Sequence, residues 1–221
     1  MLHIDNVEVF GWEAAIRGMR NPMNSWNKSD SGNVILNESD VEFGYPPNIE
    51  YRVGQNDLKL MHSLVKSGTD HSKFMRMINV TMDITAPLYW FKEFDTYKVG
   101  TVTNSCSTMH KIHSKEFDLG DFSYEHLGDS ELKLLQRIIE AMNESRSAFI
   151  NCDENYEHEK KSYWWQMIQL LPSSYNQKRT VQLNYQVLRN IYHARKTHKL
   201  DEWHTFCEEI EKLPYSELII N

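Results

Sequence analysis

Three side chains in the C-terminal third of the sequence are of types that can bind a small molecule. Asn184, Asn190 and Arg195 follow a Leu171-Pro172 pair. An amide can donate to and accept from the edge of a heterocycle, and a guanidinium is a planar cationic donor for a carbonyl or a phosphate. On a helix, the eleven residues from Asn184 to Arg195 make about three turns and return to one face, whereas Asn190 points elsewhere. The set therefore suits two ligands, or two parts of one.

A second polar group lies in the middle of the chain, where Asn104 and Ser107 flank a cysteine. A serine hydroxyl there suits either a nucleotide contact or a turn. Cys106 is a candidate nucleophile, but a lone cysteine in a segment rich in Ser, Thr and Asn is more often a small packed residue, which is the interpretation we favour. His110 and His113 have no cysteine or carboxylate set to complete a metal site, so we expect no metal.

Composition narrows the class of protein. The 221 residues suffice for one sizeable core, so we expect a single domain over 1–221. A formal charge of −7 argues against a protein that binds a nucleic acid polymer. The three cysteines form no CxxC pair, which fits a reducing compartment. No apolar stretch approaches the about 18 residues that span a bilayer. We therefore expect a cytoplasmic protein with no membrane partner.

Hydrophobic periodicity predicts the elements that must position these residues. The clearest strand covers 78–84, where Ile78, Val80, Met82 and Ile84 alternate with polar residues. A long loop is expected over 20–48, and residues 98–128 receive no assignment. The other predicted elements are strands over 3–10 and 180–183, and helices over 12–19, 57–67, 88–97, from about 129, over 155–170, over 184–196 and from 201. This mixture predicts one α+β domain.

Taken together, these features resemble the flavin-dependent thymidylate synthases of the ThyX type. That family has a Leu-Pro pair, a strand, and then a helix with two Asn residues and an Arg, matched here by Leu171-Pro172, Asn184, Asn190 and Arg195. The middle of the chain is similar in outline, with a helix, the 78–84 strand, an Ala-Pro pair and the 88–97 helix. The resemblance covers most of the chain. It implies a thymidylate-synthase-complementing (ThyX-like) α+β fold, an antiparallel sheet with flanking helices.

The resemblance also implies roles for single residues. Asn184 and Asn190 would contact the flavin, and Arg195 would contact the pyrimidine nucleotide and act in catalysis. The family has a signature motif in the middle of its chain that contains an Arg-His-Arg triplet. Asn104 and Ser107 keep their places in this central motif and would bind the substrate.

The same central motif is altered elsewhere. Its Arg-His-Arg triplet is reduced to Lys98, and Arg76 aligns with a flavin-contacting His, so both are assigned to the cofactor. Ile168 stands where the family has a phosphate-binding Arg. An arginine contact to a phosphate is worth about 1.5–3 kcal/mol, so each loss weakens binding roughly tenfold to a hundredfold. FAD binding is therefore expected to be weakened unless other cations compensate.

The activity implied by the resemblance is methylation of deoxyuridylate (dUMP) to dTMP. The methyl carbon would come from methylenetetrahydrofolate, the hydride from reduced FAD and the reducing power from NADPH, in a homotetramer whose sites combine residues of several subunits. The altered motif leaves two alternatives open. One is a nucleotide-binding protein of the same fold with a changed ligand or reaction, and the other is a non-catalytic relative.

Overall fold

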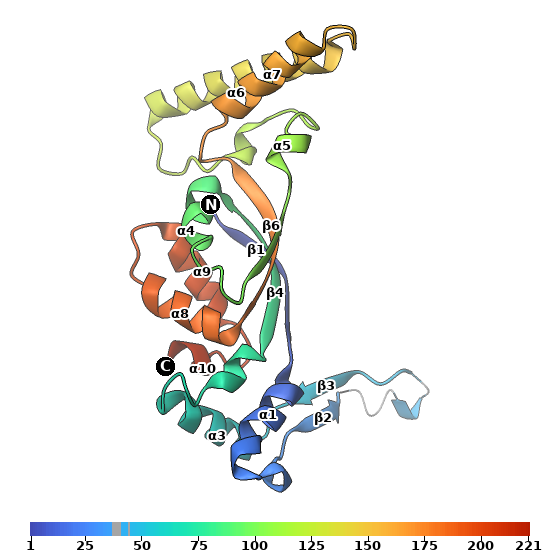
Figure 1. The fold of residues 1–221 in the computed structure, drawn as a ribbon, viewed down its shortest axis with the longest axis vertical. Coiled ribbons are helices and arrows are strands. Elements are labelled where there is room, and N and C mark those ends of the chain that lie inside the picture. Colours follow the sequence, from blue (N-terminus) through green and yellow to red (C-terminus); the bar gives the residue numbers. More distant parts are fainter. Residues whose placement is uncertain (37–40, 44) are drawn as a thin grey trace.

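A computed structural model of the chain describes residues 1–36, 41–43 and 45–221 (Figure 1). Within these ranges a four-stranded sheet forms the centre, and a two-stranded arm projects from one end of the molecule. In chain order the elements are β1 (His3–Phe10), α1 (Trp12–Arg20), β2 (Gly32–Ile35), β3 (Ile49–Arg52), α3 (Gln55–Lys66), β4 (Asn79–Pro87), α4 (Leu88–Phe94), β5 (Val102–Ser105), α5 (Thr108–Lys111), α6 (Asp129–Asn151), α7 (Glu157–Leu170), β6 (Asn176–Asn184), α8 (Tyr185–Arg195), α9 (Asp201–Glu211) and α10 (Glu217–Ile220).

The four-stranded sheet has the order β1-β4-β6-β5, and each neighbouring pair is antiparallel. β4 and β6 pair from Asn79 opposite Asn184 to Pro87 opposite Asn176. Alternate side chains of β4 are buried, which confirms the strand predicted from its alternating pattern. β6 is longer than the predicted 180–183, because its polar first half finds backbone partners on β4 that periodicity does not reveal. The predicted antiparallel sheet with flanking helices is confirmed.

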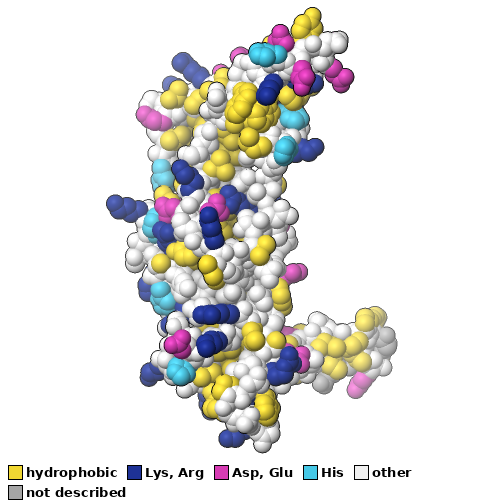
Figure 2. Space-filling view, viewed as in Figure 1, with side chains coloured by type: hydrophobic (Ala, Val, Ile, Leu, Met, Phe, Trp, Pro, Cys, Tyr) yellow, Lys and Arg dark blue, Asp and Glu magenta, His cyan; other side chains and the backbone are white. Residues whose placement is uncertain are grey.

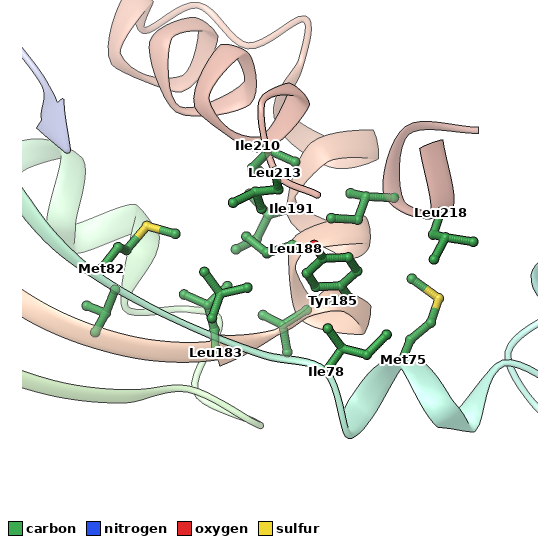
Figure 3. Packing of buried hydrophobic residues seen from close by; sticks show 14 of the residues in the cluster. Met75, Ile78, Met82, Leu183, Tyr185, Leu188, Ile191, Ile210, Leu213 and Leu218 are labelled. Carbon is green, nitrogen blue, oxygen red and sulfur yellow. The ribbon is translucent and has the colours of Figure 1, made fainter. Parts of the chain in front are cut away.

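Helices α4, α8, α9 and α10 lie on one side of this sheet (Figure 1). Side chains from β4, β6, α8 and α9 interdigitate there, among them Met82, Leu183 and Leu188 (Figure 3). Trp90 of α4 and Trp203 of α9 are fully buried, with ring centroids 4.7 Å apart. The helix predicted to begin at residue 201 is confirmed. Burial of several aromatic rings fixes how α4 and α9 sit against the sheet.

Helices α6 and α7 form a hairpin with a hydrophobic cluster of its own. Leu135, Ile139 and Met142 of α6 pack with Met167 of α7 and with aromatic residues of the segment between α5 and α6. The helix predicted from about residue 129 is therefore confirmed. The indole Nε1 of Trp164 in α7 donates to the carbonyl oxygen of Met109 at 2.9 Å, which ties the hairpin to α5.

The loop expected over 20–48 is partly wrong. Residues 32–35 form β2, which pairs with β3 in an antiparallel arm, while residues 37–40 and 44 lie outside the described ranges. A local pattern could not reveal this pairing, since β2 has only four residues and its partner lies at 49–52. Apolar side chains gather on the arm in Figure 2, and Ile35 and Ile49 are 43% and 56% exposed.

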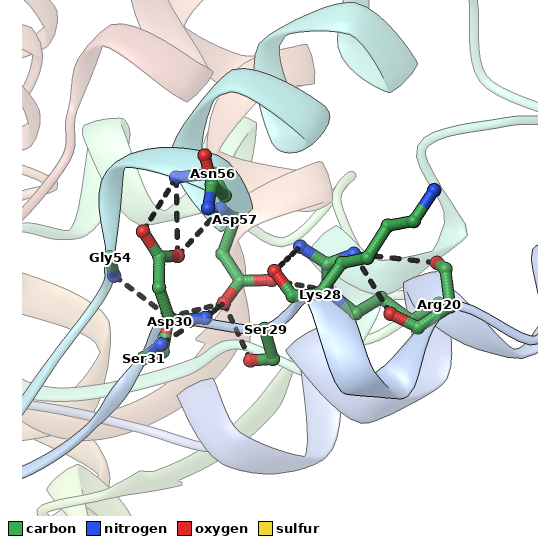
Figure 4. Close-up of polar contacts among 9 residues, drawn as sticks. Arg20, Lys28, Ser29, Asp30, Ser31, Gly54, Asn56 and Asp57 are labelled. Carbon is green, nitrogen blue, oxygen red and sulfur yellow. Dashed lines mark hydrogen bonds and ion pairs between the residues drawn. The ribbon is translucent and has the colours of Figure 1, made fainter.

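A buried ion pair fixes the base of this arm (Figure 4). Nε of Arg20 donates to Oδ1 of Asp57 at 2.6 Å, and the two side chains are 4% and 0% exposed. Oδ2 of Asp57 accepts from the hydroxyls of Ser29 and Ser31, each at 2.7 Å. Burial opposes ionisation of Asp57, but the hydrogen bonds from Ser29, Ser31 and Arg20 outweigh it and lower its pKa. The pair therefore joins α1, the segment before β2 and the start of α3.

Candidate functional site

Asn184 lies where β6 runs directly into α8 and serves as the N-cap of that helix. Its Oδ1 accepts from the backbone N–H of Val187 at 3.1 Å, a bond that satisfies one of the free donors of the first helical turn. Gly100 lies close by with φ of 80°, and a Cβ there would stand 3.1 Å from Nδ2 of Asn184. The amide predicted to contact a cofactor is thus held between the helix and the turn before β5, and its Nδ2 makes no hydrogen bond within the described residues.

Asn190 lies on the exposed surface of α8. Its Oδ1 accepts from Nε2 of Gln186 at 3.1 Å, which leaves its own N–H groups available.

Arg195 is the centre of a cluster at the other end of α8, which we term the Arg195 cluster: Arg195, Glu93, Tyr97, His198 and Trp203. Nε of Arg195 donates to the hydroxyl of Tyr97 and Nη1 donates to Oε2 of Glu93, both at 2.9 Å. The guanidinium carbon lies 4.9 Å from the ring centroid of Trp203. Nε1 of Trp203 donates to the same Glu93 oxygen at 3.1 Å, and Nε2 of His198 lies 3.2 Å from it. Arg195 is therefore fixed in orientation and its charge is shared with Glu93.

Of the two predicted cofactor cations, Lys98 directly follows Tyr97 of this cluster in the chain, whereas Arg76 belongs to another segment. Lys98 lines a cavity of about 280 Å³ between the end of α4 and β5, together with Tyr97 and Thr103. Arg76 ends the 3-10 turn before β4 and is exposed. No ion pair involves either side chain within the described residues, so both cations are free to meet an anion.

Asn104 and Ser107 occupy different surroundings. Asn104 of β5 lies opposite Thr180 of β6. Ser107 is the N-cap of α5, and its Oγ accepts from the N–H of His110 at 3.0 Å. Ser107 also lines a cavity, and Asn104 lies three residues before it in β5.

This cavity, which we term the α5 pocket, has a volume of about 380 Å³ and lies between α5, the segment after it and the start of β6. Its lining combines hydroxyls, aromatic rings and three lysines. Its lining includes the side chains of Ser107, Thr108, Lys111, Ser114, Lys115, Phe117, Tyr175 and Lys178.

Sequence reasoning missed the three lysines of the α5 pocket. Lys111 and Lys115 are four residues apart in the segment left unassigned, and Lys178 lies in the part of β6 that was not predicted. Nζ of Lys115 is 2.5 Å from Oδ1 of Asp121, and Nζ of Lys178 is 3.1 Å from Oδ2 of Asp83. The hydrogen bond to its carboxylate raises the pKa of each of these two lysines. Because β5 pairs with β6, which lies far away in the sequence, Lys178 comes close to Lys111 and Lys115.

Two sequence interpretations concern residues near the same pocket. Cys106 is exposed and lines the α5 pocket, so the packed role favoured for it is wrong; β5 is a short edge strand that offers no cover. Ile168, which the resemblance aligns with a phosphate-binding Arg, packs against the second hydrophobic cluster beside Met167. Among the described residues, no group of His, Cys, Asp and Glu could hold a metal ion.

Comparisons with known proteins were made for the sequence and for the fold. No protein-family model and no curated protein matches the sequence. The fold is similar to a ThyX thymidylate synthase from Helicobacter pylori, solved with FAD and dUMP, with a TM-score of 0.64 at 15% identity over 100% of this chain and 97% of that one. A second structure of that enzyme with FAD and dUMP gives 0.62 at 16% identity over 98% and 97%.

A further solved structure is a UMP/dUMP methylase, PolB, from Streptomyces cacaoi, bound with 5-Br dUMP. Its TM-score is 0.55 at 12% identity, over 96% of this chain and 88% of that one. Within the part of the chain that is described, no helix is long and apolar enough to cross a membrane. At these identities the likeness concerns the fold, and it agrees with the resemblance drawn from the Leu171–Arg195 region. The chain has the fold of the ThyX flavin-dependent thymidylate synthases.

Proposed function

We propose that this protein binds a pyrimidine deoxynucleoside monophosphate and methylates its base with the help of a reduced flavin, as in dUMP to dTMP conversion. The observation that supports this most is the whole-length fold shared with three structures whose bound ligands are dUMP or 5-Br dUMP, two of them together with FAD. Fold alone does not determine function, so the proposal also depends on the residues of this chain.

The Arg195 cluster supplies a fixed donor for the substrate. Trp203 and Tyr97 hold the guanidinium in place, so little side-chain entropy is lost when it donates to a carbonyl oxygen of the base. Within the described residues Nη2 makes no hydrogen bond and is the group available for this contact. Glu93 draws part of the charge away, which suits a neutral carbonyl better than a phosphate. Asn104 and Ser107 remain proposed substrate contacts.

The side chains expected to bind FAD have the chemical groups that a flavin dinucleotide requires. Asn190 offers amide N–H groups to a ring edge, while Arg76 and Lys98 are exposed cations for a pyrophosphate. Asn184 would add Nδ2. When bound, the flavin supplies the redox chemistry. Following the resemblance to the ThyX enzymes, we further propose that the complete site forms in a homotetramer, acting in the cytoplasm with methylenetetrahydrofolate and NADPH as co-substrates.

The second candidate function is nucleotide binding with a different ligand or reaction. Two observations favour it: Ile168 is part of a hydrophobic cluster, and Arg195 is already paired with Glu93. A non-catalytic relative is the third candidate and would bind no nucleotide.

The deciding experiment begins with the absorption spectrum of the purified protein, before and after FAD is added. The flavin-loaded protein, reduced without oxygen, is then given dUMP and methylenetetrahydrofolate, and dTMP is measured by mass spectrometry. We expect flavin binding and dTMP formation, with both product formation and dUMP binding weakened by Arg195→Gln and unchanged by Arg137→Gln on the surface of α6. Absence of flavin binding at high concentration would refute the methylase. If another nucleotide stabilises the folded protein and dUMP does not, nucleotide binding with a different ligand or reaction would be favoured.

A further inference from the structure

The α5 pocket carries a concentration of positive charge in a chain whose net charge is −7. Lys111, Lys115 and Lys178 reach it from three places: the end of α5, the segment that follows and β6. Further cations lie near His113, which follows α5. Burial lowers the pKa of the neighbouring His113, and the charges of Lys111, Arg146 and Lys160 lower it further. Such a hollow attracts anions.

The three lysines differ in how far they are neutralised. Lys115 lies 2.5 Å from Asp121 and 3.8 Å from Asp118, and Lys178 lies 3.1 Å from Asp83. Lys111 is exposed and forms no ion pair with any described residue. Lys111 is therefore the cation that an incoming anion meets without first displacing a carboxylate.

The rest of the lining suits a phosphate attached to a planar group. The hydroxyl of Ser107 accepts from a backbone N–H and keeps its own proton to donate, while Thr108 and Ser114 add two further hydroxyls. Phe117 and Tyr175, whose ring centroids lie 6.4 Å apart, supply aromatic surface to the lining. Lysine is a point charge with three donors, suited to a phosphate dianion.

We infer that the α5 pocket is a phosphomonoester site in which Lys111 makes the main contact, assisted by Lys115 and Lys178. If the ligand is a nucleotide, the inference rests on the proposed function, and these lysines are the groups that hold the phosphate of the nucleotide. Ile168 packs in a hydrophobic cluster and has no charge to offer, so the lysines take over the contact that the resembled family makes with arginine. Asp121 limits the strength of the site because it shares the charge of Lys115.

The test compares dUMP, deoxyuridine and inorganic phosphate by isothermal titration calorimetry at low ionic strength, using the full chain. Lys111→Gln is expected to weaken dUMP binding about tenfold to a hundredfold, the loss of one charged hydrogen bond, and to leave deoxyuridine binding unchanged. Lys111→Arg should restore most of the affinity. Lys133→Gln, an exposed lysine of α6 without an ion pair among the described residues, is the matched control and should have no effect.

Asp121→Asn provides an independent arm, because it releases Lys115 and should tighten the binding of both dUMP and phosphate. Unchanged dUMP affinity in Lys111→Gln would overturn the inference while leaving the proposed function intact. Failure of the unmodified protein to bind either dUMP or phosphate would overturn it as well. Phosphate binding that depends on Lys111, without any binding of dUMP or deoxyuridine, would support the site and refute the proposed function.

Discussion

Replacement of Asp57 by asparagine tests the physical account of the arm most directly. The substitution keeps the shape of the side chain but removes the charge that faces Arg20, whose side chain is 4% exposed. Arg20 then remains as a buried cation without a counterion. Removal of one partner from a buried pair costs about 3–5 kcal/mol, so we expect a loss of that size in the free energy of unfolding. The bonds from Ser29 and Ser31 to the amide soften the loss only if the amide oxygen takes the position of Oδ2.

The assay is urea unfolding followed by tryptophan fluorescence, with the midpoints compared at an unchanged slope. Glu50→Gln is the control, because Glu50 and Arg52 lie 2.9 Å apart on the same arm but are 53% and 59% exposed. An exposed pair contributes at most about 1 kcal/mol, so this variant should unfold close to the unmodified protein. A loss below about 1 kcal/mol for Asp57→Asn would refute the reasoning.

A double-mutant cycle with Arg20→Met sharpens the test. Each single change leaves one buried charge without its partner, whereas the double change removes both charges. The double variant should therefore lose less free energy of unfolding than the sum of the two single losses, by about 2 kcal/mol or more. The pH dependence provides a second check. Because the folded-state pKa of Asp57 lies below its ordinary value, its stabilisation is complete above about pH 4 and is lost as the pH falls through the folded-state value. The difference between the unmodified protein and Asp57→Asn should narrow over that acid range. Purely additive single losses would contradict the coupling.

Three further predictions concern the sheet, a turn and the hairpin. Hydrogen bonding from Thr180, then from an asparagine and a lysine, lowers the pKa of Asp83 to about 2; carbon NMR titration should give that value, and Thr180→Val should raise it. The stabilisation from Asp83 is thus present above its ordinary pKa and lost as pH falls through about 2. Gly11→Ala should cost more than about 2 kcal/mol in thermal unfolding, because its φ is 97° and a Cβ would meet a backbone oxygen at 2.1 Å. Gly68→Ala, with φ of 101° and open space, should cost only about 1 kcal/mol. Trp164→Phe removes a donor to α5 and should cost about 0.5–1.5 kcal/mol, with faster hydrogen exchange in α5; unchanged exchange would contradict that tie.

Parts of the fold with a local signal could be predicted from the sequence. The 78–84 strand has an alternating pattern because one of its faces lies in the core, and the helix after Asn184 begins where an asparagine caps it. The spaced set up to Arg195 led to the correct fold because helix length and capping are encoded over a few residues. The same set could not show that Arg195 would pair with Glu93, about a hundred residues away.

The features that escaped prediction all depend on distant partners. β2 is recognisable as a strand only next to β3, and Lys178 belongs to the α5 pocket only because β6 passes beside β5. Cys106 was expected to be packed on the basis of composition, yet the short edge strand before it leaves it exposed. Non-local pairing, and not residue type, decided each of these outcomes.

The separate hydrophobic cluster of the α6–α7 hairpin has a consequence for how the molecule opens. Met142 and Met167 are fully buried within it, but they belong to a smaller cluster than the one on the sheet. Cooperative units open with different free energies, and those with fewer buried apolar contacts lie at the low-stability end. The hairpin can thus unfold locally while the sheet and α8 stay intact, and the α5 pocket, tied to α7 by Trp164, would be disassembled with it. A ligand in that pocket would raise the protection of both helices together.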